Sequence, residues 1–374
     1  MRPSETKGTG RIPVLLMARE LDQGGVERDV AKIATHLDPT RFEAHVGSFN
    51  NKGMRYEELR AAGIPLLHLP VGSLFSRSAM SAAIRLGLYL KKHAIQILHC
   101  YDVTGALGVP VARCAGLPAI LASQLSYREI LDWKTQLVLR MTDPISDVVV
   151  VNCEAIRTYM VRVEGVPERR VELCYNGVDI SQFYPARVPR PAPLGMAPLV
   201  VGTVCALRPE KGLCILQEGF ARSTRPAGSK LVIVGSGAEL PALEENAARL
   251  GITTDSVFIP ATREVANWMR AIDIFVLPSY SEAFSNSLLE AMACGCAVIG
   301  SRVGGTPELI GEDERGFLFP SGDVGELARK ISTLIRDKEL RMKLAARAAA
   351  FAADLTIEVA ARRTAAIYEK LLRR

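Results

Sequence analysis

The sequence predicts an α/β protein of two doubly wound, Rossmann-type domains, each with a parallel sheet, that face each other across a cleft. Three observations lead to this prediction. A chain of 374 residues is longer than one ordinary hydrophobic core organises, so two domains are expected. Short apolar runs alternate with helical patterns along the chain, which is typical of βαβ units and parallel sheets. A proline-rich stretch separates the two halves.

The first half contains seven short apolar runs that we interpret as β-strands. The first of them, Ile12–Ala18, lies between Arg11 and Arg19 and is too short for the apolar region of a signal peptide. Helical patterns separate the runs, as at Val26–Leu37 and Ala79–Lys92. The expected strands are residues 12–18, 44–49, 65–69, 96–100, 119–123, 147–152 and 171–174.

Five prolines between Pro185 and Pro198 then interrupt the alternation. Because proline breaks helices and cannot donate to a sheet, this stretch is expected to be a semi-rigid linker. Strand-like runs resume at residues 199–205, 231–234, 257–260, 274–277 and 297–300, and the pattern is helical from Val324 onward. The predicted limits are an N-terminal domain at 1–184, a linker at 185–198, a C-terminal domain at 199–355 and a final helix at 356–374 that can pack back on the first domain.

The composition indicates a globular protein of the cytoplasm. Hydrophobic residues make up 48% and charged residues 23%, and no apolar run approaches the roughly 20 residues of a membrane-spanning helix. The eight cysteines are scattered without the spacing of a zinc site, which favours free thiols in a reducing compartment.

The positive charge is concentrated in the first half of the chain. Residues 1–190 carry 24 Lys and Arg against 19 Asp and Glu, a balance of +5, and the remaining residues carry 22 against 21, a balance of +1. The segment Arg77–His93 resembles a basic amphipathic helix, with Arg85, Lys91 and Lys92 among Leu86, Leu88, Tyr89 and Leu90. We therefore expect binding to an anionic membrane surface, peripherally at its inner face; a solvated helix face is the alternative.

Two glutamates, Glu282 and Glu290, flank the start of a predicted helix that ends at Gly295. A helix start offers free N–H groups and the positive end of the helix dipole to a diphosphate. A carboxylate inside the helix can accept from a ribose hydroxyl, and one in the preceding loop can contact a transferred sugar. The alternative is helix capping, because Ser287 with Glu290 and Ser279 with Glu282 both fit a capping box.

The wider pattern resembles the retaining glycosyltransferases of family 4, which have the GT-B fold. Glu282 is followed by seven residues and then by Glu290-Ala-Met-Ala-Cys-Gly295, and after the next strand by Val303-Gly-Gly-Thr-Pro-Glu308. The resemblance implies that Glu290 holds the donor ribose, that Glu282 contacts the donor sugar at the reacting centre, and that the backbone of Phe284, Ser285 and Asn286 lines the diphosphate. Ala283 stands where the family usually has glycine.

Arg208 and Lys211 follow the first strand of the C-terminal domain. Two cations at a strand end can neutralise a leaving diphosphate, and a solvated turn is the alternative. The resemblance implies that both side chains bind the phosphates and that both are catalytic residues. Lys211 matches the family lysine, whereas the commonest arginine position holds Ala206, so the role passes to Arg208.

Three further elements are expected near the nucleotide. Gly235 and Gly237 form a strand-to-helix turn that resembles part of a dinucleotide fingerprint. By resemblance, Arg263 lies in the segment that frames the base. Gly24 and Gly25 open the first helix, where backbone can approach a ligand closely, and the family carries a glycine pair there that approaches the donor.

The strand at 119–123 departs from the family pattern. Many relatives end it with a histidine near the reacting sugar, and this chain has none there. We expect Ser123 or Gln124 to supply a neutral hydrogen bond on the acceptor side instead. His99, one strand earlier, is interpreted as a buried or capping histidine.

Together with the resemblance, these observations imply a retaining glycosyltransferase. It is expected to move a sugar from a nucleoside diphosphate sugar, by resemblance a UDP-sugar, to a glycan or lipid-linked acceptor, as in polysaccharide or glycoconjugate biosynthesis. The donor is expected in the C-terminal domain and the acceptor in the N-terminal domain. No metal ion is expected, because Arg208, Lys211 and the helix dipole take its place. No other cofactor and no nucleic acid are expected. The alternatives are a nucleotide-sugar-binding protein without turnover and an epimerase or phosphorylase on the same fold.

Overall fold

The chain folds into two units, one of which is discontinuous in sequence. The computed structural model describes residues 10–22, 24–186 and 188–373. Unit 1 comprises Met1–Tyr175 and Ile357–Arg374, and unit 2 comprises Asn176–Thr356. The first stretch of unit 1 therefore ends before position 184, and the proline-rich residues expected as a linker lie within unit 2. They include one 3-10 turn, η4 (Ala192–Leu194).

Unit 1 is built on a seven-stranded sheet in the order β3-β2-β1-β4-β5-β6-β7. All adjacent strands pair in parallel, with Leu16 opposite Val46 on one side and His99 on the other. The seven strands expected from the sequence are all present. They are β1 (Ile12–Glu20), β2 (Phe42–Asn50), β3 (Leu66–His68), β4 (Ile97–Tyr101), β5 (Ala119–Gln124), β6 (Val148–Val151) and β7 (Val171–Leu173).

Helices pack on both faces of this sheet. One core cluster joins α1 and α14 to the strands, and a second joins α3 and α4 to the opposite face. The helices are α1 (Gly25–His36), α2 (Met54–Ala61), α3 (Arg77–Lys92), α4 (Gly105–Cys114), α5 (Trp133–Thr142), α6 (Glu154–Arg162) and α14 (Ile357–Leu372), with short 3-10 helices η1 (Asp102–Thr104), η2 (Arg128–Ile130) and η3 (Glu168–Arg170).

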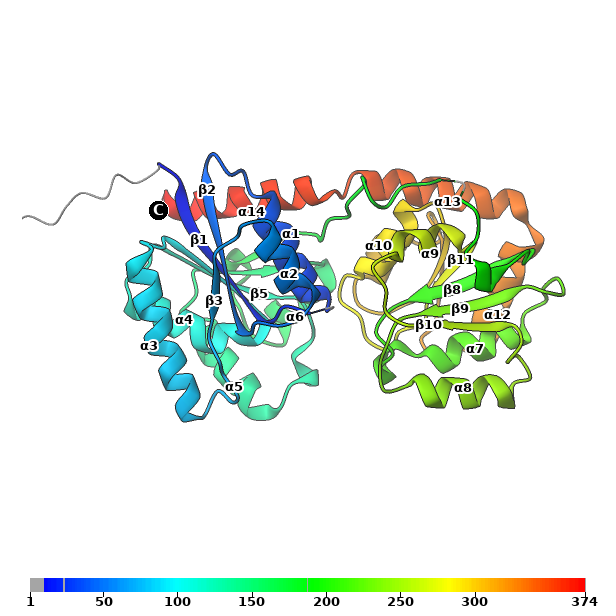
Figure 1. Cartoon of the computed structure of the whole chain (residues 1–374), viewed down its shortest axis with the longest axis horizontal. Coiled ribbons are helices and arrows are strands. Elements are labelled where there is room, and N and C mark those ends of the chain that lie inside the picture. The colour runs from blue at the N-terminus through cyan, green and yellow to red at the C-terminus, as the bar shows by residue number, and fades with distance from the viewer. Residues whose placement is uncertain (1–9, 23, 187, 374) are drawn as a thin grey trace, which may run out of the picture. The chain divides into compact units, whose positions relative to one another are not determined.

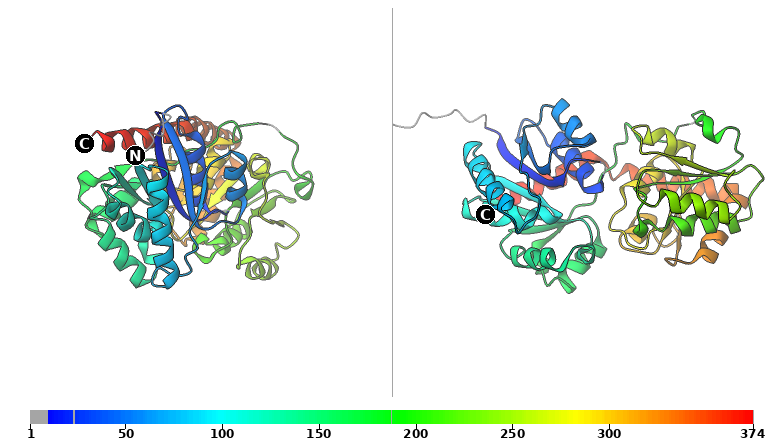
Figure 2. Two further views of the ribbon diagram at one scale, coloured as in Figure 1. Left: turned by 60° about the vertical axis from the view of Figure 1, so that its left-hand side comes forward. Right: turned by 60° about the horizontal axis from the view of Figure 1, so that its bottom comes forward.

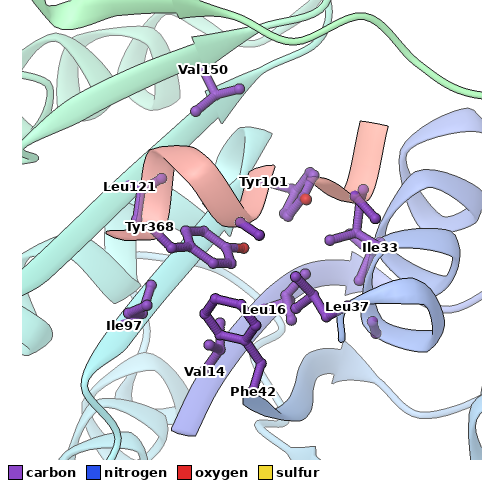
Figure 3. Close-up of a cluster of buried hydrophobic side chains, with 14 of the residues drawn as sticks. Val14, Leu16, Ile33, Leu37, Phe42, Ile97, Tyr101, Leu121, Val150 and Tyr368 are labelled. Carbon is purple, nitrogen blue, oxygen red and sulfur yellow. The ribbon is translucent and has the colours of Figure 1, made fainter. Parts of the chain in front are cut away.

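The last helix, α14, is part of the core of unit 1. Figure 3 shows its Tyr368 among side chains from strands and α1, and Tyr368 packs edge-on against Phe42 with ring centroids 6.0 Å apart. The Tyr368 hydroxyl lies 2.8 Å from Nδ1 of His99, whose Nε2 lies 2.7 Å from Oγ of Ser123. Burial lowers the pKa of His99 to about 3, so this ring is neutral at physiological pH. The interpretation of His99 as a buried histidine is confirmed.

Unit 2 is built on a six-stranded parallel sheet in the order β10-β9-β8-β11-β12-β13. Its strands are β8 (Val200–Val204), β9 (Lys230–Val234), β10 (Ser256–Ile259), β11 (Ile274–Leu277), β12 (Ala297–Ser301) and β13 (Phe317–Phe319). The sequence did not predict β13, because three apolar residues between Gly316 and Pro320 are too few to show a strand pattern.

Helices α9 and α10 lie on one side of the unit 2 sheet and α7 and α8 on the other (Figure 1). The helices are α7 (Leu213–Arg222), α8 (Leu240–Arg249), α9 (Val265–Ala271), α10 (Asn286–Ala293), α11 (Thr306–Ile310), α12 (Val324–Arg336) and α13 (Lys338–Ala353), and η5 (Pro209–Lys211) follows β8. The strand order reverses between β8 and β11, and in unit 1 between β1 and β4. In open parallel sheets, ligands bind outside the carboxyl ends of the strands at such a reversal.

Candidate functional site

Three loops meet at the carboxyl ends of β8, β11 and β12 in unit 2. Gly212 and Gly304 both have positive φ, +61° and +49°. A Cβ at Gly212 would collide with the backbone oxygen of Pro278, and one at Gly304 with that of Glu282. The backbone N–H of Tyr280 also donates to the carbonyl of Glu210 at 2.8 Å. The glycines thus let the loops close on one another and fix the position of Glu282.

Lys211 and Glu282 form an ion pair in this cluster of loops. The Lys211 Nζ lies 2.7 Å from Oε2 of Glu282, and the Ser279 hydroxyl lies 3.2 Å from the same oxygen. The two charged side chains are 21% and 14% exposed, so solvent reaches both. Burial alone would lower the pKa of Lys211, but the carboxylate of Glu282 outweighs it and the pKa is raised. Lys211 is therefore a fixed positive charge at the strand reversal.

Glu290 lies inside α10 rather than at its cap. Ser285 is the N-cap, and its hydroxyl accepts from the backbone N–H of Leu288 at 3.3 Å. Glu290 is the fifth residue of the helix and its side chain is buried. Capping boxes at Ser287–Glu290 and at Ser279–Glu282 are therefore wrong, since the first serine lies within the helix and the second precedes no helix. The carboxylates of Glu282 and Glu290 need another explanation than capping.

The residues leading into α10 lie at the same edge of the sheet. Phe284 and Ser285 are buried and Asn286 is half-buried at the first helical position. The amide of Asn176 donates to the carbonyl of Phe284 at 3.4 Å. This hydrogen bond and the Ser285 cap hold the segment in place.

The two arginines of the predicted site are not brought against this cluster. The Arg208 side chain is 63% exposed and its nearest carboxylate, Glu210, is 3.9 Å away. Arg263 is also exposed, in the loop between β10 and α9. Long exposed side chains can move toward a ligand, but the positions of these two arginines do not by themselves indicate a binding site.

Gly235 and Gly237 turn the chain after β9 against the segment that follows β8. A Cβ at Gly235 would collide with the carbonyl of Cys205, and one at Gly237 with that of Leu207. The N–H of Leu207 donates to the carbonyl of Ser236 at 3.0 Å. Close backbone packing alone explains why glycine occupies both positions.

In unit 1, Gly24 and Gly25 follow β1 at the strand reversal. Gly24 is the N-cap of α1, and a Cβ there would collide with the carboxylate of Glu27. Asp102 follows β4 at the same reversal and has a left-handed backbone with φ of 46°. Burial, and to a smaller extent the charge of Glu27, raises the pKa of Asp102 to about 6. Sequence reasoning missed Asp102, although its place directly after β4 marks a strand end.

Ser123 and Gln124 are buried in unit 1. Ser123 lies against His99, as described above. The amide of Gln124 donates to the carbonyl of Ser126 at 2.7 Å and its oxygen accepts from Nε of Arg128 at 2.8 Å. Both side chains thus make hydrogen bonds within the unit.

Arg128 is the largest fully buried side chain of the described residues, and no sequence signal pointed to it. Its guanidinium binds both oxygens of Asp143, at 2.8 and 3.0 Å, and one of Glu164 at 3.1 Å. Glu164 also accepts from Arg140 and from the Tyr159 hydroxyl, each at 2.8 Å. These contacts form one buried charge network behind β5.

No group of three or more His, Cys, Asp or Glu side chains in the described residues is arranged to hold a metal ion. None of the helices among residues 10–22, 24–186 and 188–373 is long and apolar enough to cross a membrane.

Comparison with known families matches both halves of the chain. The family described as Glycosyltransferase Family 4 matches residues 23–182, and the family described as Glycosyl transferases group 1 matches residues 190–351. The second match includes Lys211, Glu282 and Glu290.

Individual relatives agree with these matches. The D-inositol 3-phosphate glycosyltransferase of Streptomyces bingchenggensis is 32% identical over 244 residues, covering 61% of this chain and 54% of that protein. The N-acetyl-alpha-D-glucosaminyl L-malate synthase of Bacillus anthracis is 28% identical over 185 residues, covering 49% of each chain. The chain thus spans about half the length of the curated relatives that it matches.

Among solved structures, Anabaena HepE in complex with UDP and glucose superposes with a TM-score of 0.84. It covers 96% of this chain and 100% of its own, at 22% identity, so the likeness shows a shared fold. Two parallel-sheet α/β units, two family matches and this superposition lead to one conclusion: the chain belongs to the family 4 glycosyltransferases of group 1 and has the GT-B fold.

Proposed function

We propose that this protein transfers a sugar from a nucleoside diphosphate sugar, with UDP as the nucleotide, to a glycan or lipid-linked acceptor in the cytoplasm, with retention of anomeric configuration. The observation that carries the proposal is the Lys211–Glu282 pair, held by glycine-dependent loops at the strand reversal of unit 2. The similarity to HepE, whose structure contains UDP and glucose, supports the nucleotide.

In this proposal the donor rearranges the ion pair. Without donor, the carboxylate of Glu282 neutralises Lys211. A diphosphate carries more negative charge than one carboxylate and competes for the lysine, which frees Glu282 to contact the sugar. The start of α10 adds its dipole and Arg208 a second cation, so the leaving diphosphate is stabilised without a metal ion.

The remaining predicted residues have supporting roles. Glu290 holds the ribose, the backbone of 284–286 lines the diphosphate, and Arg263 with the turn at Gly235 and Gly237 frames the nucleotide. In unit 1, Gly24 and Gly25 contact the donor, and Ser123 and Gln124 serve the acceptor side. The leaving phosphate takes the proton of the acceptor, so no protein base is required.

Lys211→Ala tests the proposed phosphate contact. A charge-assisted hydrogen bond is worth about 1.5–3 kcal/mol, so UDP and UDP-sugar affinities should both fall by that amount. Titration calorimetry measures this, and Lys343→Ala, an exposed lysine on α13, is the matched control. Unchanged UDP affinity in Lys211→Ala would reduce the Lys211–Glu282 pair to a structural contact.

Glu290→Gln tests the ribose contact in a thermodynamic cycle that combines the side-chain change with removal of a ribose hydroxyl from UDP. If Glu290 accepts from ribose hydroxyls, the unaltered protein should bind UDP better than its 2′- or 3′-deoxy analogue, and the variant should lose most of that preference. Calorimetry with the three ligands measures it. Glu245→Gln, on the exposed side of α8, should behave as the unaltered protein. An equal preference in variant and unaltered protein would remove Glu290 from the ribose.

Turnover separates the transferase from a binding protein without activity. Release of UDP from UDP-sugar in the presence of a mixed acceptor extract, followed by NMR of the anomeric proton of the product, reports both transfer and retention. Tight UDP binding with no acceptor-dependent release would favour the binding protein.

A further inference from the structure

Helix α3 exposes a stripe of large apolar side chains. Met80, Ile84 and Leu88 follow one another at four-residue spacing, which places them on one face, and they are 67%, 60% and 65% exposed. The face that packs on the sheet is a different one, formed by Ala79, Ala82, Leu86 and Leu90. The sequence pattern listed Leu86 and Leu90 with Leu88 and Tyr89 as apolar residues of an amphipathic surface helix. The structure shows that Leu86 and Leu90 are buried against the sheet.

Helix α5 repeats the same arrangement. Trp133, Leu137 and Met141, again four residues apart, are 69%, 50% and 66% exposed, whereas Thr135, Leu139 and Thr142 are buried. Phe75 precedes α3 and Ile130 precedes α5, and both are exposed. These two segments hold eight of the fifteen exposed large hydrophobic side chains of the described residues, so the apolar exposure of the protein is concentrated here.

The two stripes belong to one layer of unit 1. Helix α4 packs against both α3 and α5, so the three helices lie side by side on the sheet. Figure 2 shows this layer with α3 turned toward the viewer. We call the surface formed by the exposed stripes of α3 and α5, with Phe75 and Ile130, the apolar face.

Positive charge borders the apolar face. Residues 72–93 contain no Asp or Glu, and their four Lys and Arg residues, Arg77, Arg85, Lys91 and Lys92, are exposed. On α5, Lys134 lies over the Trp133 ring, 5.6 Å from its centroid. Of the acidic residues beside α5, Asp132 caps the helix through the N–H groups of Lys134 and Thr135, and Glu129 is exposed.

We propose that the apolar face docks into an anionic lipid bilayer, with the side chains of both stripes entering the acyl boundary and the lysines and arginines contacting lipid phosphates. Apolar stripes with a tryptophan and flanking basic residues have the composition of helices that lie in the membrane interface. A second copy of this chain is a poorer occupant, because two such faces would bring their basic rims together. The surface uses no residue of the donor site in unit 2, so it adds to the proposed transfer activity and does not depend on it.

Vesicle flotation with the whole chain tests the proposal. Vesicles of phosphatidylcholine alone are compared with vesicles that contain phosphatidylglycerol, at low and at high salt. The unaltered protein should float with the anionic vesicles at low salt. Ile84→Ser/Leu88→Ser/Trp133→Ser/Leu137→Ser should lower the partition coefficient at least about tenfold, because it removes the inserted apolar area.

A second variant addresses the charge. Arg77→Gln/Arg85→Gln/Lys91→Gln/Lys92→Gln should lose the preference for anionic vesicles and most of the salt dependence. Matched controls lie on α13 of unit 2: Met342→Ser, which removes an exposed apolar side chain, and Lys338→Gln/Lys343→Gln. Each control should float as the unaltered protein does. All variants carry surface changes, and UDP affinity in each reports whether the donor site is intact, independently of flotation.

Two results would overturn the proposal. One is equal flotation of the unaltered protein and the apolar variant. The other has two parts: the unaltered protein does not float with anionic vesicles, and sedimentation without lipid shows a dimer that the apolar variant does not form. This result would assign the apolar face to a second copy of the chain.

Discussion

Glu282→Gln is expected to lower the rate of transfer by about 10²–10³-fold, the range observed when one group that acts at a reacting centre is removed. The glutamine keeps the size of the side chain but loses the charge that faces Lys211 at 2.7 Å. Free UDP has no sugar for Glu282 to contact, and Lys211 would no longer be neutralised. UDP should therefore bind the variant as well as the unaltered protein or better.

The comparison of binding with turnover makes this result specific. Calorimetry with UDP and a UDP-release assay are run on the same samples. Glu245→Gln is the control, because it removes an exposed carboxylate of α8 in the same unit. Unaltered activity in Glu282→Gln would sink the catalytic assignment. A parallel loss of UDP binding and melting temperature would show that the pair only supports the loops.

Arg128→Met is expected to destabilise unit 1 by about 3–5 kcal/mol, the cost of leaving a buried charge without its partner. Asp143 would lose both hydrogen bonds to the guanidinium, and Glu164 would keep those from Arg140 and Tyr159. The carboxylate of Asp143 is the group left uncompensated. Urea unfolding followed by far-ultraviolet circular dichroism measures the change.

Two further variants isolate the buried charge as the cause. Arg128→Met/Asp143→Asn removes the orphaned carboxylate and should recover part of the lost stability. Arg60→Met breaks an exposed pair with Glu57 and should cost less than about 1 kcal/mol. A loss in Arg128→Met no larger than in Arg60→Met would show that the network contributes little to stability.

Much of the fold could be predicted because its signals are local. The strand at 274–277 and the helix that starts after Ser285 lie where apolar runs, serines and glycines indicated. The Lys211–Glu282 pair was also within reach, since the two residues lie in the segments that follow β8 and β11, and the carboxyl ends of adjacent parallel strands meet at one edge.

What the sequence could not show depends on contacts between distant residues. Arg128, Asp143 and Glu164 meet in the core with no period or motif in their spacing. In the sequence of α3, buried and exposed leucines look alike, and only the structure shows that Leu86 packs on the sheet while Leu88 is exposed. Nor could the capping alternative be rejected before the cap was located at Ser285.

The return of the chain to unit 1 as α14 has a consequence for synthesis on the ribosome. Domains usually fold in the order in which they emerge, the N-terminal one first. Here Tyr368 and Leu371 fill the core beside Phe42, so unit 1 cannot complete its packing until the segment that follows unit 2 has emerged. Unit 2 is one continuous segment, so it can fold as soon as its own residues have emerged. The part of the protein that is translated first is therefore the last to be finished, and its unfilled core is the surface that a chaperone would meet on the nascent chain.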